Sequence, residues 1–283
     1  MEFLMNQRLL LMLAITLLLS GCSKDNIPVY LSESVDTRFT ESMNWNANHP
    51  TNEINVESDD YTIFTMADCH IGTTSNLDKF LNNAHSLKPT AIIIDGDLTG
   101  GLSEDYTVFE DHFPKDYVIP SFFLVGNHDL WYNGWSEFYK RFGSSSYTFT
   151  VRTSGGTDLF ICVDTGGNTL GKLQTEWLTQ ILQSERSAYR RCIIITHINL
   201  FRHRHTESTN LVEEELCSLL NLFTVNKVDM VITGHDHNAY AEEFGVTTYI
   251  QVDALEDGLS NAGYMKLEVK NGILGYKFVN VNE

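Results

Sequence analysis

The feature that most constrains the fold is a regular alternation of two sequence patterns from about residue 60 to the end of the chain. Short β-branched or aromatic runs, typical of strands, lie at residues 61–68, 91–97, 118–129, 158–165, 191–197 and 228–235. Segments with helical periodicity lie between them, at 76–87, 103–113, 134–142, 173–184 and 210–225. This alternation predicts an α/β fold with one continuous core, without an internal repeat or a second domain.

The last of these helix candidates carries the clearest signals. Asn210 is a good N-cap residue, and the glutamates at 213–215 suit the positive end of a helix dipole. Apolar side chains recur on one face, at Val212, Leu216, Leu219, Leu220 and Phe223. From 247 to 281 the pattern indicates further strands, separated by turns such as Lys-Asn-Gly at 270–272.

Polar side chains follow five of the strand candidates, each at the point where the strand ends. The five groups are Asp68 and His70; Asp97; Asn127, His128 and Asp129; His197; and His235 and His237. Taken alone, the last pair fits a polar turn after a strand equally well. Because ligands bind outside the carboxyl ends of strands in open α/β sheets, five such ends together predict one converging site.

The chemistry of these side chains indicates metal ions. With His128 and Asp129 set aside, seven candidate ligands remain, which offer oxygen and imidazole nitrogen without thiolate. Such a set suits Mn²⁺, Fe²⁺/Fe³⁺, Zn²⁺ or Co²⁺ better than Ca²⁺ or Mg²⁺. Seven ligands are too many for one ion and fit two, with the carboxylate of Asp97 as the natural bridge. Two metals about 3.5–4 Å apart favour displacement at phosphorus and make hydroxide available near neutral pH.

Two residues of the third group have roles other than metal binding. His128 lies beside the candidate ligand Asn127, where an imidazole can protonate a departing alkoxide, and such acid catalysis is worth about 10² to 10⁴ in rate. Asp129 can orient that imidazole, or it can be a carboxylate that stabilises the loop. The sequence leaves these two roles of Asp129 open.

The five groups resemble the signature of the calcineurin-like metallophosphoesterases, which is Asp-x-His, Gly-Asp, Gly-Asn-His-Asp/Glu, His and Gly-His-x-His in that order. Here it reads Asp68-Cys69-His70, Gly96-Asp97, Gly126-Asn127-His128-Asp129, His197 and Gly234-His235-Asp236-His237. The segment Leu-Gln-Thr-Glu-Trp-Leu at 173–178 is also similar to a Gln-x-x-Trp-Leu pattern of many members.

The resemblance implies a four-layer α-β-β-α sandwich, with two sheets flanked by helices. It implies that Asp68, His70 and His237 bind one metal and that Asn127, His197 and His235 bind the other. In the same way it implies Asp97 as the bridge and His128 as the proton donor or transition-state stabiliser. The chain departs from the protein phosphatases of the family, which continue the second block as Gly-Asp-x-x-Asp-Arg-Gly, because residues 96–101 read Gly-Asp-Leu-Thr-Gly-Gly.

The N-terminal residues indicate export and a lipid anchor. Arg8 precedes an apolar run at 9–19, which is shorter than the roughly 20 residues that span a bilayer. Leu-Ser-Gly-Cys at 19–22 resembles the lipobox of bacterial lipoproteins, although an ordinary signal peptide with an incidental cysteine is the alternative. We therefore expect a signal peptide at 1–21, lipidation at Cys22, a loosely ordered tether and lead-in at 22–58, and the catalytic domain at 59–283.

Other features limit the partners of the chain. A net charge of −18 argues against a nucleic-acid polymer as partner. Arg202, His203 and Arg204 follow the ligand His197, where they can hold a substrate phosphate or form a solvated loop. Aromatic side chains at Trp131, Tyr132 and Trp135 suit either substrate stacking or core packing.

The cysteines after Cys22 are predicted to be mostly buried free thiols, with Cys69 facing into the sheet. They are Cys69, Cys162, Cys192 and Cys217.

The sequence thus predicts a dinuclear metal-dependent phosphoester hydrolase, tethered to a bacterial cell envelope as a periplasmic or outer-membrane lipoprotein. The missing Asp-Arg pair favours a phosphodiesterase. Two alternatives remain, a phosphomonoesterase or nucleotidase of the same fold, and an envelope lipoprotein that binds a ligand on this scaffold without turnover.

Overall fold

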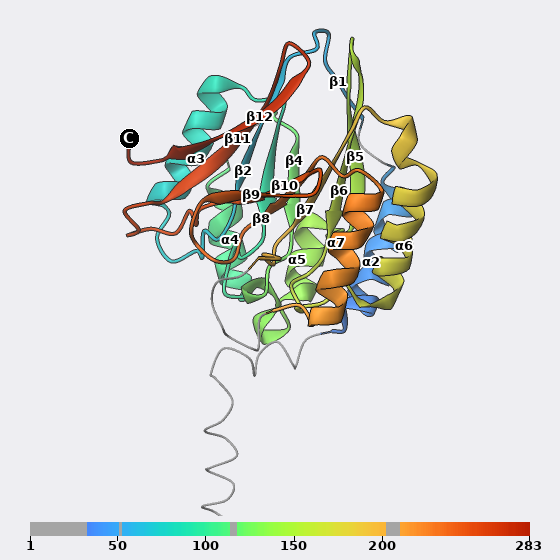
Figure 1. Ribbon diagram of the computed structural model, residues 1–283. Coiled ribbons are helices and arrows are strands. Elements are labelled where there is room, and N and C mark those ends of the chain that lie inside the picture. The colour runs from blue at the N-terminus through green and yellow to red at the C-terminus, as the bar shows by residue number, and fades with distance from the viewer. Residues whose placement is uncertain (1–32, 51–52, 114–117, 202–209) are drawn as a thin grey trace, which may run out of the picture.

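The strands of the computed structural model form two sheets that pack face to face (Figure 1). The structure describes residues 33–50, 53–113, 118–201 and 210–283. The first sheet has the strand order β1 (Glu53–Asn55), β5 (Tyr147–Thr153), β6 (Gly156–Val163), β7 (Arg191–Thr196), β8 (Met230–Thr233), β10 (Thr247–Gln251), β9 (Tyr240–Phe244). The second has the order β12 (Ile273–Asn280), β11 (Gly263–Lys270), β2 (Tyr61–Met66), β3 (Ala91–Asp95), β4 (Ser121–Leu124).

Parallel pairing brings the ends of distant strands to one edge of the sandwich. In the second sheet β2, β3 and β4 are parallel, and in the first β6, β7, β8 and β10 are parallel. The central strands β3 and β7 are buried along their whole length, which explains their unbroken isoleucine runs. The remaining strands add antiparallel pairs at the margins, such as the β11–β12 hairpin.

The space between the two sheets holds the main apolar core. It includes Ile63 and Ile93 from one sheet and Phe160 and Ile195 from the other. The rings of Phe122 and Phe149 stack across the interface with centroids 3.7 Å apart. This interdigitation holds the two sets of strand ends in a fixed relation to each other.

Helices cover both outer faces and complete four layers (Figure 1). The second sheet carries α3 (Ser75–Leu87), α4 (Ser103–Asp111) and α5 (Trp135–Phe142), and the first carries α6 (Gly171–Ser184) and α7 (Glu213–Val225). Two short 3₁₀ segments, η2 (His128–Asn133) and η3 (Arg186–Ala188), lie in connecting loops. The predicted α/β sandwich of two sheets flanked by helices is therefore confirmed.

The structure differs from the sequence prediction before residue 59. The segment expected to be a loosely ordered lead-in contains a helix, α2 (Val35–Asn48), and the strand β1, which pairs with β5. The helix packs on α6, with the rings of Phe39 and Trp177 5.7 Å apart. Its buried face mixes polar with apolar residues, including Arg38 and Ser42, and this mixture hides the helical periodicity in the sequence.

The start of the last long helix was also predicted incorrectly. α7 begins at Glu213 rather than at 210, and Val212 occupies its N-cap position without a side-chain cap. Leu219 and Phe223 are buried on its inner face as expected, whereas Val212 is exposed. The predicted glutamates do lie in its first turn, where they interact favourably with the helix dipole, whereas the predicted cap by Asn210 is not formed.

Several predicted features lie outside the described residues, namely the signal segment, Cys22 and the basic loop with Arg202, His203 and Arg204. Of the remaining cysteines, Cys69, Cys162 and Cys192 are buried and free, and Cys217 is free but exposed. Among the described helices, none combines the length and the apolar character that a bilayer-spanning helix needs.

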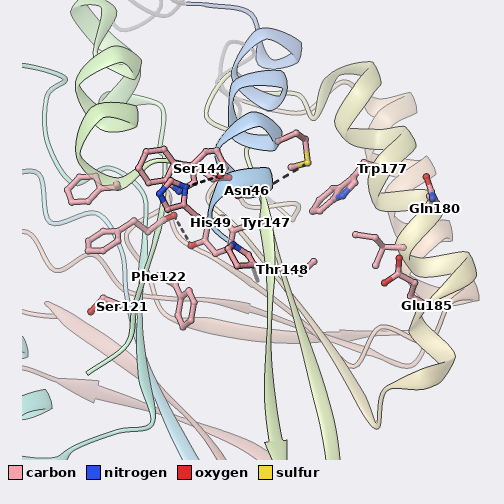
Figure 2. Close-up of a pocket in the computed structure, with 16 residues that line it drawn as sticks. Asn46, His49, Ser121, Phe122, Ser144, Tyr147, Thr148, Trp177, Gln180 and Glu185 are labelled. Carbon is pink, nitrogen blue, oxygen red and sulfur yellow. Dashed lines mark hydrogen bonds between the residues drawn. The ribbon is translucent and has the colours of Figure 1, made fainter. Parts of the chain in front are cut away.

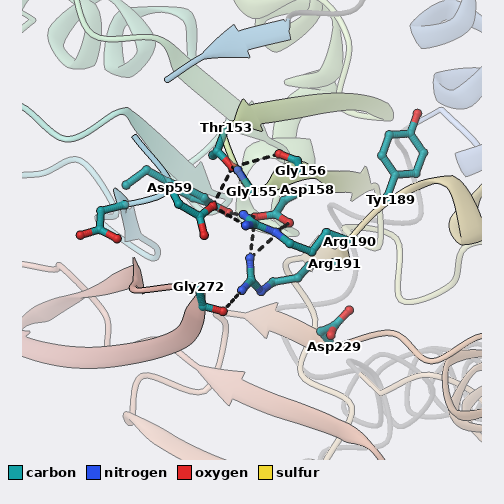
Figure 3. A network of polar contacts seen from close by, with 12 residues as sticks. Asp59, Thr153, Gly155, Gly156, Asp158, Tyr189, Arg190, Arg191, Asp229 and Gly272 are labelled. Carbon is teal, nitrogen blue, oxygen red and sulfur yellow. Dashed lines mark hydrogen bonds and ion pairs between the residues drawn. The ribbon is translucent and has the colours of Figure 1, made fainter. Parts of the chain in front are cut away.

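Two further features lie away from the ligand-bearing strand ends. At the opposite end of the sandwich, Arg190 and Arg191 converge on the buried carboxylate of Asp158, which also accepts a hydrogen bond from Tyr61 at 2.7 Å (Figure 3). A cavity of about 590 Å³ lies between α2, α6 and the β4–β5 margin (Figure 2). Trp45, Phe122, Tyr147 and Trp177 are among its lining residues, and none of the seven candidate ligands is.

Candidate metal centre

The candidate ligands lie in loops that directly follow β2, β3, β4, β7 and β8. These loops are joined to one another by backbone hydrogen bonds, from Asp68 N to Gly96 O at 3.1 Å and from His70 N to Asp97 O at 3.0 Å. A third bond runs from Gly234 N to His197 O at 3.0 Å and joins the two loops of the other sheet. Four of the five strand ends are therefore joined in two pairs by the backbone itself.

Backbone strain is concentrated at the candidate ligands. Five of the seven are non-glycine residues in the left-handed region, with φ of 52° at Asp68, 40° at His70, 50° at Asp97, 77° at His235 and 59° at His237. L-residues with side chains rarely adopt this conformation, and each instance costs of order 1–3 kcal/mol. Strain of this kind persists where the surrounding structure fixes it, and it clusters at functional sites.

One group of ligand atoms joins the two sheets. His237 Nε2 lies 3.3 Å from Asp68 Oδ1 and 3.3 Å from His70 Nε2, and His70 Nε2 lies 3.8 Å from Asp68 Oδ1. One carboxylate and two imidazoles thus face a common point, at which a single cation could be bound.

A second group of ligand atoms lies beside the first, and its member Asp97 is also close to a ligand of the first group. Asp97, His197 and His235 each offer a ligand atom, and these atoms lie within 4.8 Å of one another. Asp97 Oδ2 is 3.3 Å from His197 Nε2 and 3.7 Å from His70 Nε2, a ligand of the first group. The carboxylate therefore lies between the two groups, where a bridging ligand is needed.

Several buried polar atoms fit a metal that would complete their coordination. Asp68 Oδ1, Asn127 Oδ1 and His197 Nε2 are buried, and within the described ranges none has a hydrogen-bond partner. Because buried polar groups in folded proteins are almost always paired, these three unpaired atoms, in the loops after β2, β4 and β7, match the predicted ions. Mixed carboxylate, amide and imidazole donors are a set that divalent transition metals accept.

Hydrogen bonds to the remaining atoms orient these ligands. His197 Nδ1 donates to Asp95 O at 2.7 Å, which leaves Nε2 aimed at the carboxylates. His235 N donates to Asp68 Oδ2 and His128 N donates to Asp97 Oδ1, each at 2.7 Å. Such outer contacts fix the tautomer and the direction of a ligand before the metal arrives.

The electrostatic field of the site favours positive charge. Burial opposes charge on His197, yet Asp97 and Asp68 raise its pKa well above the ordinary value. Burial likewise opposes charge on His237, whose pKa Asp68 raises. Burial acts to raise the pKa of Asp97, but His197 and His128 hold it well below its usual range. The same field that stabilises imidazolium would stabilise bound cations.

Two glycines of the predicted motifs permit this close packing. A Cβ at Gly126 would lie 2.2 Å from Asp97 Oδ1, and a Cβ at Gly234 would lie 2.7 Å from Asp68 Oδ2. Both distances are shorter than any real contact of this kind. The glycines that begin the third and fifth groups are thus required by the approach of the loop backbone to the carboxylates.

His128 faces the site, and Trp131 holds it there. His128 Nε2 lies 4.0 Å from Asp97 Oδ2, and its ring meets the ring of His70 edge-on with centroids 4.5 Å apart. The indole of Trp131 covers the other side of the His128 ring, at a centroid distance of 3.9 Å. Burial lowers the pKa of His128, and Asp97 acts in the opposite direction. Sequence analysis weighed Trp131 only for substrate stacking or core packing and missed this contact.

Asp129 makes the contacts of a loop-stabilising carboxylate. Its oxygens accept backbone N–H bonds from Gly126 at 2.9 Å, Leu98 at 3.2 Å and Thr99 at 3.0 Å, and one of them accepts from the hydroxyl of Tyr106. These bonds join the loop after β3 to the loop after β4. None of them reaches the imidazole of His128, so the contacts favour the second of the two roles that the sequence left open.

The other aromatic and acidic residues near the site have distinct positions. Trp135 is buried in a small core with Phe138, and Tyr132 is exposed. Glu256, which sequence analysis did not identify, places Oε2 4.0 Å from His237 Nδ1. It belongs to the loop after β10, and no pattern in the sequence marks it as a neighbour of the site.

Comparisons with known structures agree with this architecture. GAP50, the anchor in the inner membrane complex of Plasmodium, matches with a TM-score of 0.61 at 16% identity, over 80% of this chain and 86% of that chain. A dimetal phosphatase from Danio rerio matches with a TM-score of 0.62 at 11% identity, over 78% and 96%. Purple acid phosphatase from yellow lupin seeds matches with a TM-score of 0.60 at 15% identity, over 80% of this chain and 52% of that chain. At such identities these likenesses support the fold alone.

The comparison with curated proteins found no match. The comparison with protein families found one that covers most of the chain. The model described as calcineurin-like phosphoesterase matches residues 61–239, a range that includes every strand end with a candidate ligand. Together with the two adjacent ligand groups around Asp97, this match shows that the chain belongs to the calcineurin-like phosphoesterase family.

Proposed function

We propose that this chain is a dinuclear metal-dependent hydrolase of phosphodiesters. The position of Asp97 is the observation that carries the proposal. Its Oδ2 lies within 3.3 Å of His197 Nε2 and 3.7 Å of His70 Nε2, and these histidines belong to the two separate ligand groups. A buried carboxylate shared in this way is what two neighbouring divalent ions require.

The proposed ligand assignment is supported by the adjacent groups of ligand atoms and, for Asn127, by the family resemblance and its unpaired buried Oδ1. One ion is held by Asp68, His70 and His237, and the other by Asn127, His197 and His235, with Asp97 between them. When bound, two ions of Mn²⁺, Fe²⁺/Fe³⁺, Zn²⁺ or Co²⁺ stabilise charge on the phosphoryl oxygens and lower the pKa of water.

The protein itself supplies the proton and the alignment. His128 Nε2 lies 4.0 Å from Asp97 Oδ2 and its side chain is partly exposed to solvent, so in this proposal Nε2 donates a proton to the departing alkoxide oxygen. Trp131 restricts rotation of this imidazole, and Asp129 holds its loop against the loop of Asp97. Proton donation of this kind contributes about 10² to 10⁴ in rate when the leaving group is poor.

The preference for diesters rests on the second motif. The segment after Asp97 reads Leu-Thr-Gly-Gly and lacks the Asp-Arg pair of the protein phosphatases. In the structure it packs against the third loop, since a Cβ at Gly101 would lie 2.1 Å from Trp131 O. A phosphomonoesterase or nucleotidase activity on the same metal centre is the second candidate, because the ligand set alone does not distinguish the two ester classes.

We further propose that the protein is exported and lipid-anchored at a bacterial cell envelope. The apolar run at 9–19 followed by Leu-Ser-Gly-Cys supports this proposal, with cleavage before Cys22. Replacing Cys22 with Ala should release the protein from membranes into the soluble fraction. A Cys22→Ala protein that stays with membranes would disprove lipidation at this residue.

The hydrolase proposal is tested with bis-p-nitrophenyl phosphate and p-nitrophenyl phosphate in the presence of Mn²⁺. We expect turnover that a chelator abolishes, with the diester preferred. Asp97→Ala should lose turnover together with bound metal. His112→Asn is the matched control, since His112 pairs with Asp78 at 2.6 Å away from the site and its loss should leave turnover unchanged. Failure to bind metal, together with no turnover on a broad phosphoester panel, would favour the non-catalytic ligand-binding alternative.

A further inference from the structure

The chain enters the described fold at the same edge as the candidate ligands. Arg38, in the first turns of α2, binds Asp164 just beyond the carboxyl end of β6, with Nε 2.6 Å from Oδ2. Asp36 Oδ1 accepts a hydrogen bond from Leu173 N at the start of α6. Figure 1 shows α2 beginning at the lower end of the sandwich, opposite the β11–β12 and β5–β6 turns at the top.

This point of entry is close to the catalytic loop. The side-chain amide of Asn133, in the orientation that satisfies both groups, donates to the carboxylate of Glu33 at 2.9 Å. Asn133 ends the same 3₁₀ segment that begins with His128. Asn133 follows His128 by five residues, and a chain of that length spans at most about 18 Å, so residue 33 lies on the metal-centre side of the fold.

The remaining tether is too short to pass around the molecule. Ten residues lie between Cys22 and Glu33, and the eleven steps from one to the other span at most about 40 Å in a fully extended chain. A domain of this size has a radius of gyration of about 18 Å, and the path around half of the equivalent sphere is about 70 Å. A lipid on Cys22 therefore lies on the side of the metal centre.

We propose that the protein works with its metal-centre edge facing the membrane that holds Cys22, and that its substrates are phosphodiesters in the headgroups of lipids on that surface. The proposal deepens the proposed hydrolase function and rests on it and on the lipid anchor. It places the reacting phosphorus in the plane of the headgroups, within reach of His128 and Asp97.

The surface of this edge suits contact with lipid. Leu102, Tyr132 and Val212 are large apolar side chains exposed there, each in a loop or first helical turn that follows a ligand-bearing strand. Tyr132 is 68% exposed, and tyrosine is enriched at membrane interfaces because its ring is amphipathic. Single apolar side chains of this kind anchor an edge weakly, so the lipid on Cys22 provides most of the attachment.

Charge selects the type of lipid. The first turns of α4 and α7, at the same edge, carry Glu104, Asp105 and the glutamates 213–215. The whole chain has a net charge of −18. An anionic surface would repel these described acidic turns, so we expect the headgroups to be zwitterionic; Arg202 and Arg204, between β7 and α7, lie outside the described residues.

The orientation is tested with the full lipidated chain in vesicles of a zwitterionic phospholipid. An environment-sensitive fluorophore is placed at Tyr132→Cys or, as the matched control, at Ile273→Cys. Both positions are exposed, at 68% and 71%, and Ile273 lies at the start of β12, at the opposite end of the sandwich. Cys217→Ser removes the exposed native thiol among the described residues. Lipids with a spin label on the headgroup serve as the quencher.

We expect strong quenching at position 132 and none at position 273, because the domain separates the two labels by more than the range of the quencher. Equal quenching at both positions, or stronger quenching at 273, would overturn the proposed orientation. Adding anionic lipid to the vesicles should weaken quenching at 132, and a stronger signal would contradict the predicted choice of zwitterionic lipid.

The substrate part of the proposal is tested by activity on two diesters. Cys22→Ala should reduce hydrolysis of vesicle headgroups and leave hydrolysis of soluble bis-p-nitrophenyl phosphate unchanged. Full activity of the anchored wild type on the soluble diester, with none on headgroups, would overturn the lipid substrate while the hydrolase function stands. Inactivity on every diester with intact orientation would instead contradict the hydrolase function.

Discussion

Replacing Arg38 with Ala should destabilise the protein strongly, because it leaves Asp164 charged, buried and without its cation. Arg38 Nε and Nη2 contact Asp164 Oδ2 and Oδ1 at 2.6 and 3.1 Å, and both side chains are at most 1% exposed. Removing one partner of a buried pair costs about 3–5 kcal/mol. For a domain of this size each kcal/mol lowers Tm by about 2–4 °C, so the expected decrease is about 6–20 °C.

A second ion pair of the same N-terminal segment provides the control. Arg152 in β5 pairs with Glu53 in β1, but both side chains are largely exposed, at 57% and 41%. Solvent-exposed pairs contribute little, so Arg152→Ala should leave Tm close to that of the wild type. Both variants remove one arginine that ties residues before 59 to the domain, and they differ in burial.

Urea denaturation followed by circular dichroism measures both variants on the same scale. The account predicts a large decrease in the free energy of unfolding for Arg38→Ala and a negligible decrease for Arg152→Ala. A decrease in the free energy of unfolding below 1 kcal/mol for Arg38→Ala would show that the stability of the protein does not depend on the buried Arg38–Asp164 pair. Equal losses for the two variants would show that burial is not the cause.

Three further outcomes are expected. Trp131→Ala should slow hydrolysis of an alkyl phosphodiester more than that of bis-p-nitrophenyl phosphate, because His128 loses its alignment and only the poor leaving group needs a proton; equal slowing would contradict this role. Asp158→Ala should cost about 3–5 kcal/mol in thermal or urea unfolding, since it leaves two arginines without their shared buried partner (Figure 3), and a loss near zero would contradict it. Burial acts to raise the pKa of Asp257, but hydrogen bonds from the Thr73 hydroxyl and from two backbone amides of α3 outweigh burial and lower this pKa. The ionised carboxylate therefore stabilises the fold above its unfolded pKa of about 3.9, and this stabilisation is lost as pH falls through the lower folded pKa. Asp257→Asn should therefore be less stable than the wild type at pH 7, and the difference should shrink as pH falls below about 3.9; a difference that does not change with pH would contradict the linkage.

The metal centre was the most predictable part of the protein. Its ligands follow strands whose apolar runs are visible in the sequence, and parallel strands must bring such ends together. The structure places Asp68, His70, Asp97, His197, His235 and His237 in adjacent groups. It also explains the glycines before Asn127 and His235 as positions where a Cβ would meet a carboxylate.

Contacts between side chains of different loops could not be predicted. The role of Asp129 depends on three amides from two loops, and a sequence does not say which of its neighbours point toward it. Within one loop, the ring of Trp131 contacts that of His128 three residues earlier, and the sequence does not say which way the indole turns.

The N-terminal helix was missed for a different reason. Its buried face includes Arg38 and Ser42, so a search for apolar periodicity finds little. The signals that remained were local, namely Ser34 as an N-cap that accepts from Thr37 N and Asp36 in the first turn. A buried ion pair can replace apolar contact in a helix face, and patterns of hydrophobicity do not detect it.

Metal stoichiometry tests the central claim most directly. The purified protein is stripped of metal and loaded with Mn²⁺, and excess Mn²⁺ is removed by gel filtration. Bound Mn²⁺ per chain is then measured by inductively coupled plasma mass spectrometry for the wild type, for Asp97→Ala and for the control His112→Asn. The account predicts two ions per chain for the wild type and the control, and a loss of bound metal for Asp97→Ala, whose carboxylate lies between both ligand groups. A wild-type protein that binds no metal, or an Asp97→Ala variant that retains both ions, would contradict it.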